Sequence, residues 1–199
     1  MLELLFWQHL DTEVLRAINS CHAPALDWLM WWISDRFIWI PLYLILAAMF
    51  VIKMGWVRTL EVIGLTLLVI LLTDQVCASL IRPYVERLRP SNLENPIHSS
   101  LHIVNGYRGG RYGFPSCHAA NTFALAIFLS LFYRWRYLTI SLIGWSLIVS
   151  FSRVYLGVHY PGDVIIGSLI GAFFAIMIYI LYTRLLRPYY LAHTALPIP

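Results

Sequence analysis

Three short segments of the sequence concentrate residue types that bind and transfer phosphate. They are RPYVERLRP at residues 82–90, PSCH at residues 115–118 and SRVYLGVHYPGD at residues 152–163. Arg82, Arg89 and Arg153 are permanent cations, and the guanidinium fork matches the geometry of phosphate oxygens. Ser116 stands where a helix N-cap is expected, so the free amides of residues 116–118 form a further anion-binding element. Together these residues predict a phosphate cradle.

The same segments supply a nucleophile, a carboxylate and an acid. Asp163 lies four residues after His159 and follows Pro161, which suits the first turn of a helix. A carboxylate at that spacing can hold the second ring nitrogen of the histidine and fix its tautomer. His118 lies in the turn after Ser116, on a different segment. Cradle, nucleophile, orienting carboxylate and acid together predict phosphoryl transfer.

Each of these residues also has a structural interpretation. Arginines at span ends commonly extend their charge to the interface, and a single interfacial histidine is often structural. A histidine and an aspartate four apart also occur as metal ligands. No third ligand stands in a suitable position, however, and three nearby arginines would repel a cation, so we expect neither metal nor cofactor. The structural alternatives would all have to coincide on one membrane face.

The composition indicates which kind of element positions these residues. Of 199 residues, 60% are hydrophobic and 12% are charged, whereas soluble domains contain about 25% charged residues. So few charges cannot cover a water-exposed surface, which predicts an integral membrane protein with one domain over residues 1–199. The net charge of +4 does not indicate nucleic-acid binding, because lysine is nearly absent and the arginines are dispersed.

Apolar runs predict an all-α fold, a polytopic transmembrane helix bundle of about five spans. The runs cover residues 37–52, 56–81, 117–133, 137–152 and 164–183. A span needs about 17–25 residues, so the shorter runs require flanking turns. Residues 82–115 are the only long connection and are expected to form the outer active-site loop. Residues 188–199 are expected to be a tail.

The N-terminal residues 1–25 are predicted to form an amphipathic helix that lies in the membrane interface. Its apolar positions Phe6, Leu10, Val14 and Ile18 fall four apart. A helix that caps the end of the bundle is the alternative. No cleavable signal peptide is expected, because a basic region and an uninterrupted apolar core are both absent at this end.

Short connections set the expected orientation. Threading the spans alternately places the basic residues of the short connections on one side: Lys53, Arg58, Arg134, Arg136, Arg184 and Arg187. Only Glu61 opposes them, so the positive-inside rule makes that side cytoplasmic. The chain is therefore predicted to cross the inner (cytoplasmic) membrane, with a cytoplasmic C-terminus. All three phosphate segments then face the periplasm or exterior, although their arginines played no part in the assignment.

The three segments resemble the signature of the type 2 phosphatidic acid phosphatase superfamily. That signature reads Lys, six residues, Arg-Pro; then Pro-Ser-Gly-His; then Ser-Arg, five residues, His, three residues, Asp. The third part matches fully from Ser152 to Asp163, and the others depart from it at one position each. Arg82 replaces the lysine and keeps the charge as a planar fork. Cys117 replaces the glycine, and we expect helical backbone angles there, which cysteine tolerates.

The resemblance implies a double displacement. His159 would attack phosphorus and form a phosphohistidine, with Asp163 stabilising the charged ring. Phosphate-binding roles would fall to Arg82, Arg89, Ser116 and Arg153, which hold the oxygens as charge spreads over them. His118 would protonate the departing alkoxide and then deprotonate the water that releases phosphate. No metal would be needed, because guanidinium groups supply the positive charge.

The loop between the first two segments is expected to select the substrate. Residues 91–114 contain VNGYRGGRYGF, with four glycines and the additional cations Arg108 and Arg111. A plain flexible connector is the alternative. Within the second span, Asp74 lies about 12 Å deeper than Arg82 on nearly the same helix face, so we expect it to have a packing role.

The predicted function is hydrolysis of a lipid phosphate or diphosphate in the bilayer. Undecaprenyl diphosphate, phosphatidylglycerol phosphate, phosphatidic acid and lipid A phosphate are all candidates, because the signature contacts only the phosphate. A vanadate-dependent haloperoxidase would be soluble, unlike this apolar chain. A non-enzymatic phosphate or lipid transporter is the alternative from another class. Transporters usually place charged residues near the bilayer midplane, and neither Glu61 nor Asp74 is central in its span.

Overall fold

The computed structural model describes residues 2–186, in which the regular elements are all helices and no strand is formed. The helices are α1 (Leu2–Ser20), α2 (Pro24–Ser34), α3 (Ile40–Gln75), α4 (Arg82–Val85), α5 (Cys117–Tyr133), α6 (Arg136–Tyr155) and α7 (Pro161–Leu181), with a π-helical stretch at Val76–Ile81. The predicted all-α bundle is confirmed. Arg187 and the predicted tail lie outside the described residues.

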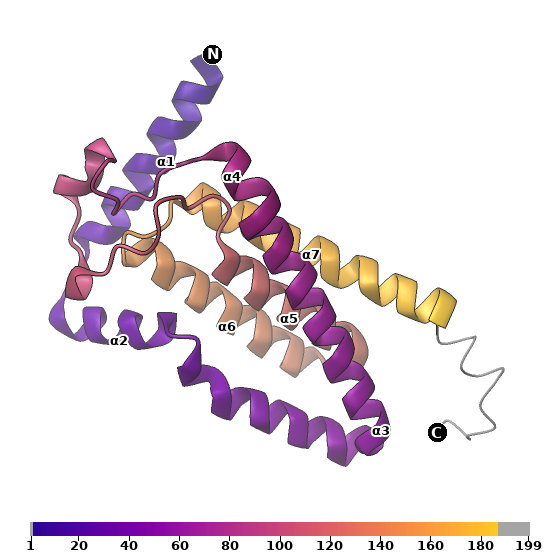
Figure 1. The fold of residues 1–199 in the computed structure, drawn as a ribbon. Coiled ribbons are helices and arrows are strands. Elements are labelled where there is room, and N and C mark those ends of the chain that lie inside the picture. Colours follow the sequence, from indigo (N-terminus) through magenta and orange to yellow (C-terminus); the bar gives the residue numbers. More distant parts are fainter. Residues whose placement is uncertain (1, 187–199) are drawn as a thin grey trace.

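Apolar helices form the body of the bundle. Within the described chain, three segments are long and apolar enough to cross a membrane, Phe37–Val85, Arg136–Tyr155 and Pro161–Leu185, and Cys117–Tyr133 is a shorter apolar helix. The first segment has 49 residues and holds two of the predicted spans. It turns back at Gly55, where φ is 78° and ψ is 170°, so α3 forms two arms (Figure 1). Glycine adopts such a positive φ without steric cost.

Two glycines allow α7 to pack closely against α5. A side-chain carbon at Gly167 would collide with the backbone oxygen of Ser116, and one at Gly171 would collide with that of Ala120. Without these glycines the two helices could not approach so closely, as in other small-residue helix contacts. The contact fixes the start of α7, which carries Asp163, against the start of α5, which carries His118.

The connections of the bundle lie at opposite ends. The bend of α3, the α5–α6 connection and the end of α7 lie at one end, whereas the long loop before α5 and the α6–α7 connection lie at the other (Figure 1). The described basic residues used to predict orientation all belong to the first group of segments: Lys53, Arg58, Arg134, Arg136 and Arg184. The three phosphate segments belong to the second end.

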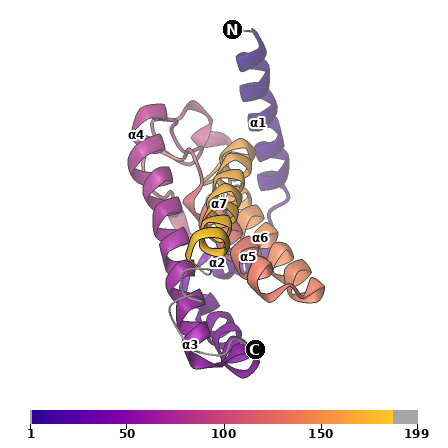
Figure 2. The ribbon, with the colours of Figure 1, turned by 90° about the vertical axis from the view of Figure 1, so that its right-hand side faces the viewer.

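Helix α1 leans away from the bundle and extends its N-terminus beyond the loop end (Figures 1 and 2). Phe6, Trp7 and Leu10 on this helix are exposed. Asn19 attaches the other end of the helix, because its side chain donates to the carbonyls of His102 (2.9 Å) and Tyr155 (2.8 Å). The helix therefore has one docked side and one free apolar side, and its location in the membrane interface stays a prediction.

Candidate active site

The site lies where the long loop meets the starts of α5 and α7 and the end of α6. Each predicted residue occupies a helix end or a connection: Arg82 starts α4, Arg89 lies in the loop, Ser116 caps α5, His118 is in its first turn, Arg153 is in the last turn of α6, His159 is in the α6–α7 connection, and Asp163 is in the first turn of α7. Helix ends hold these side chains more rigidly than a free loop would.

His159 is held on both ring nitrogens. Its Nδ1 lies 3.4 Å from Oδ2 of Asp163, and its Nε2 lies 2.7 Å from Nη1 of Arg89. The ring also bonds the backbone of Gly113, a loop residue that approaches it closely. Burial, reinforced by the charges of Arg89 and Arg153, holds the pKa of His159 well below its ordinary value of 6.5. The imidazole is therefore neutral at physiological pH, as a nucleophile must be.

Asp163 is a buried carboxylate whose two oxygens have different partners. Oδ2 faces His159 and accepts the backbone N–H of Tyr160 at 3.0 Å. Oδ1 accepts Nη1 of Arg87 at 2.8 Å. The side chain of Asp163 is 1% exposed. A buried charge loses its hydrating water, and these hydrogen bonds take the place of that water. Pro161 and the Tyr160 cap place the residue one turn from His159, as the spacing predicts.

The three predicted arginines are partly bonded and partly free. Arg82 donates Nη2 to the carbonyl of Pro115 (3.2 Å) and to Sγ of Cys117 (2.9 Å). Arg89 donates Nη1 to the carbonyl of Val158 at 3.0 Å. Arg153 donates to the hydroxyls of Ser34 and Tyr107. Each keeps a buried Nε–H without a partner among the described residues. Buried donors are rarely left unpaired, so these three groups indicate a place for an anion.

The electrostatics of the cluster favour a negatively charged ligand. Burial and the neighbouring charges of Arg153 and Arg82 lower the pKa of Arg89 to about 10, so Arg89 is still a cation at neutral pH. Tyr107 lies against Arg153; burial alone would raise the pKa of this phenol, but Arg153 and Arg89 outweigh that effect and lower it. Among the described residues, no group of three or more His, Cys, Asp and Glu side chains could hold a metal ion.

Ser116 and Cys117 begin α5 as the sequence predicts. The Oγ of Ser116 accepts the backbone N–H of Ala119 at 3.5 Å, so this side chain caps the helix. Cys117 is the first residue of the α-helix, which agrees with the expected helical backbone at this departure from the signature. Its thiol accepts a hydrogen bond from Arg82. The two residues that differ from the family signature, Arg82 and Cys117, are therefore in direct contact.

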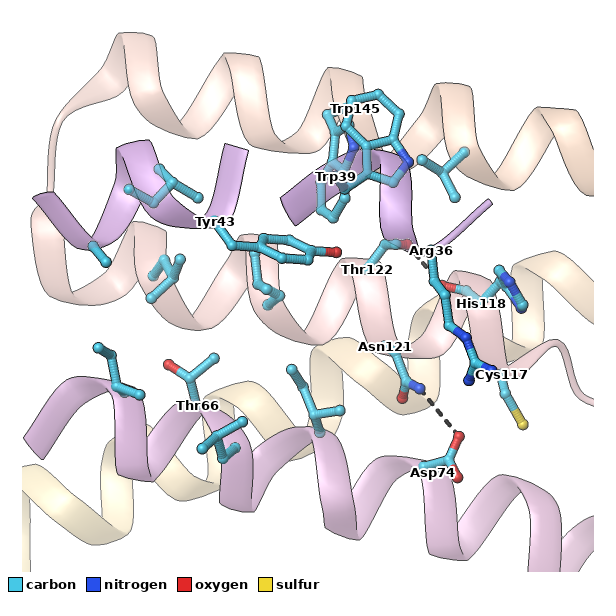
Figure 3. Close-up of a pocket in the computed structure, with 18 of the residues that line it drawn as sticks. Arg36, Trp39, Tyr43, Thr66, Asp74, Cys117, His118, Asn121, Thr122 and Trp145 are labelled. Atoms are coloured by element: carbon cyan, nitrogen blue, oxygen red, sulfur yellow. Dashed lines mark hydrogen bonds between the residues drawn. The ribbon is translucent and has the colours of Figure 1, made fainter. Parts of the chain in front are cut away.

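His118 lies where two cavities meet. A polar cavity of about 430 Å³ is lined by Trp31, Arg36, Tyr107, His118 and Arg153, among others. An apolar cavity of about 510 Å³ runs between α3, α5 and α6. Figure 3 shows Arg36 extending past His118 toward Cys117, all three lining the apolar cavity, and Asp74 bonded to Asn121 on its wall. His159 and Arg89 do not line either cavity; they lie buried behind this surface.

The predicted substrate-loop cations make their bonds inside the loop. Arg108 donates to the carbonyl of Ser91 at 2.6 Å, and Ser91 returns a bond to the carbonyl of Arg108. Arg111 forms an ion pair with Glu94 at 2.8 Å, in which both side chains are more than half exposed. These contacts fold the loop on itself. A role in substrate selection therefore stays a prediction for both residues.

Several residues near the site were missed by the sequence interpretation. Arg87 stands inside the first segment but was assigned no role, although it reaches Asp163. Arg36 and Tyr107 line the polar cavity, and Asp11 of α1 binds Arg87. A weak signal existed for Arg87, two residues before Arg89 in a segment already selected. None existed for Asp11, whose partners are distant in the chain.

Comparison with known proteins places this chain in a family. Residues 63–187 match the family described as the PAP2 superfamily. The lipid A 4'-phosphatase of Bacteroides thetaiotaomicron is 45% identical over 168 residues, which cover 84% of this chain and 75% of the relative. The lipid A 4'-phosphatase of Porphyromonas gingivalis is 32% identical over 174 residues, which cover 86% of this chain and 72% of the relative.

A solved structure agrees with the fold. The crystal structure of Aquifex aeolicus LpxE aligns with a TM-score of 0.68 and 25% sequence identity, covering 85% of this chain and 94% of that chain. The family match and the helical bundle define the class of membrane PAP2 phosphatases. The chain belongs to the PAP2 superfamily, in its bacterial membrane lipid phosphatase branch.

Proposed function

We propose that the protein hydrolyses the phosphomonoester of a membrane lipid at the outer face of the inner membrane through a phosphohistidine, with lipid A 4'-phosphate as the first candidate substrate. One observation carries the proposal. The His159–Asp163 pair lies beside two buried arginines, Arg89 and Arg153, and the partly buried Arg82. Among the described residues, the Nε–H of each arginine is buried and has no partner. A neutral nucleophile and spare cationic donors are what attack on a phosphate dianion requires.

The first chemical step needs a change of partner at Arg89. Its Nη1 occupies the lone pair of His159 Nε2 at 2.7 Å. When an incoming phosphate oxygen accepts that donor, Nε2 is freed to attack phosphorus on the side opposite the lipid oxygen. The P–N bond forms as the P–O bond to the lipid breaks, and Asp163 Oδ2 stabilises the charged ring through Nδ1.

His118 completes the cycle from the cavity side. His118 lines both cavities, which supports a role for it at the departing lipid oxygen and at the attacking water. It donates a proton to the lipid alkoxide and then accepts one from the water that attacks the phosphohistidine. Inorganic phosphate and the neutral His159 are the products of the second step. The positive charge in both steps comes from guanidinium groups, so we propose that no metal takes part.

The lipid substrate is supported by the apolar cavity and by the relatives. The cavity of about 510 Å³ opens beside His118 and is lined mainly by apolar side chains such as Leu46, Phe50 and Leu125. Acyl chains fit there while the phosphate enters the polar cavity, so the substrate is amphiphilic. Both bacterial relatives named above are lipid A 4'-phosphatases, which makes that phosphate the first to test.

Phosphate release from the purified protein tests the chemistry. The panel is lipid A, undecaprenyl diphosphate, phosphatidylglycerol phosphate and phosphatidic acid, each assayed with excess EDTA. We expect release from lipid A to be fastest and to persist in EDTA. No release from any of the four lipids would refute the enzymatic proposal and favour the transporter alternative. Loss of activity in EDTA that magnesium or zinc restores would refute metal independence.

Thiol labelling in intact cells tests the orientation. Cys21 is exposed at the loop end, so the reporters need a Cys21→Ser background. In that background, Leu93→Cys in the loop should react with a membrane-impermeant reagent, whereas Trp135→Cys in the α5–α6 connection should react only after permeabilisation. Both wild-type side chains are exposed. The reverse pattern would place the site in the cytoplasm.

A further inference from the structure

Arg87 lies between two carboxylates that come from opposite ends of the chain. Its Nη1 donates to Oδ1 of Asp163 at 2.8 Å, and its Nη2 donates to Oδ2 of Asp11 at 2.6 Å. The guanidinium also lies 3.9 Å from the centre of the Tyr160 ring. Two short charge-assisted bonds and an aromatic face hold the planar group in one orientation.

Asp11 is itself held by the start of α7. Its Oδ1 accepts the backbone N–H of Gly162 at 2.7 Å. A side-chain carbon at Gly162 would lie 2.9 Å from Oδ2 of Asp11, so glycine at this position leaves room for the carboxylate. Asp11 therefore binds the residue next to Asp163 and the arginine that contacts Asp163. Helix α1 thus closes a ring of contacts around the orienting carboxylate.

The two carboxylate oxygens of Asp163 have separate hydrogen-bond partners. Oδ1 is bonded to Arg87 and to no other described residue, which leaves Oδ2 for His159 and the Tyr160 amide. A carboxylate fixed at one oxygen cannot rotate away from the imidazole. Arg87 also brings a positive charge to a carboxylate that is 1% exposed, which offsets the cost of burying it.

We propose that Arg87 is a positioning residue for Asp163 and that Asp11 of α1 anchors Arg87, so that the N-terminal helix completes the catalytic site. This inference rests on the proposed function of His159 and Asp163. Asp11 lies outside residues 63–187, the part of the chain that matches the family. The signature that predicts the nucleophile includes neither Arg87 nor Asp11.

The charge of Arg87 gives the proposal a readout that a purely structural contact lacks. The charged and titratable groups around His159 and Asp163, and around their direct neighbours, come from several elements: Asp11 of α1, Arg36 after α2, Arg82 of α4, Arg87, Arg89 and Tyr107 of the long loop, His118 of α5, Arg153 of α6 and Tyr160 before α7. Removing the Arg87 cation makes protonation of the His159–Asp163 pair easier. The acid limb of the pH profile of kcat/KM therefore moves to higher pH. Removing the Asp11 anion does not move it upward.

The test compares four variants of the full-length protein: Arg87→Met, Arg87→Lys, Asp11→Asn and Glu13→Gln. Glu13 is the matched control, an acidic residue on the same helix whose ion pair with Arg16 is largely exposed. We expect Arg87→Met to lower kcat on the order of 10²-fold, because small displacements of catalytic groups cost about that much. KM should change little, and the acid limb should shift upward. Arg87→Lys should keep the acid limb of the wild type and should have a kcat between those of Arg87→Met and the wild type.

Asp11→Asn should lower kcat by a smaller factor without the upward shift, and Glu13→Gln should match the wild type. Melting temperatures in detergent identify variants that fail to fold, in which case Arg87→Lys and Asp11→Asn decide the question. Wild-type kcat and pH profile in Arg87→Met, or equal losses in Asp11→Asn and Glu13→Gln, would overturn this inference. Absence of phosphate release from the wild type would instead refute the proposed function.

Discussion

The polar and the apolar cavity share a wall but differ in how they are built. The polar cavity is lined by Arg153 and Tyr107, which are joined by a directional hydrogen bond. The apolar cavity is lined by aliphatic and aromatic side chains of α3, α5 and α6, which offer volume with little directionality. His118 belongs to both. Under the proposed function, the polar end would determine whether phosphate is transferred, and the apolar end would determine which lipid presents it.

The largest effect should follow from removing the nucleophile at the polar end. In His159→Ala no other side chain can carry the phosphoryl group, so kcat should fall by about 10⁴-fold or more with every substrate. Phosphate release from purified protein measures it, with His98→Gln as the control, because among the described residues His98 bonds only within the loop. Loss of activity with one lipid alone would contradict the proposed division of roles, since the polar end should not distinguish lipids.

A smaller, substrate-dependent effect should follow from filling the apolar cavity. Ala47 lines it, whereas the neighbouring Ala48 is exposed and does not. Because each buried methylene of an acyl chain contributes about 0.8 kcal/mol, Ala47→Trp should lower kcat/KM about tenfold or more for a long-chain lipid phosphate. A short soluble phosphomonoester should be hydrolysed as by the wild type. Equal losses with both substrates, or equal losses in Ala48→Trp, would contradict the division of roles.

The buried neutral His159 should make stability depend on pH. Its pKa is held well below 6.5 in the folded protein, so the unfolded chain binds a proton that the folded site refuses. Stability is therefore complete above about pH 6.5 and falls as the pH drops further, by up to about 1.4 kcal/mol per unit. Melting curves in detergent measure this loss, which His159→Gln should reduce. An unchanged pH dependence in that variant would contradict a neutral buried ring.

The smallest effect is expected at Asp74, on the wall of the apolar cavity. Asp74 accepts a hydrogen bond from Asn121 at 3.1 Å and lines the apolar cavity. Asp74→Asn should keep most of the activity and lower the free energy of unfolding by about 1 kcal/mol, the size of one hydrogen bond. An inactive variant with an unchanged melting temperature would instead place Asp74 in the chemistry.

Local signals predicted most of the site, and long-range contacts account for the rest. The spacing of His159 and Asp163, the N-cap at Ser116 and the apolar runs are all properties of short windows. Gly55 divides one continuous apolar helix into two arms, in agreement with the two predicted runs. By contrast, Asp11 binds Gly162 across 151 positions, and Arg153 binds Ser34 across 119. No window of sequence contains both partners, so only the fold reveals these contacts.

Trapping the covalent intermediate tests the central claim most directly. The wild-type protein is mixed with a lipid phosphate substrate and quenched in alkaline detergent before turnover is complete. The protein is then digested, and its peptides are analysed by mass spectrometry. The account predicts phosphate on the peptide that contains His159, formed before inorganic phosphate appears and absent in His159→Ala. Rapid turnover without any phosphorylated peptide, or phosphate on a different residue, would contradict a phosphohistidine at this position.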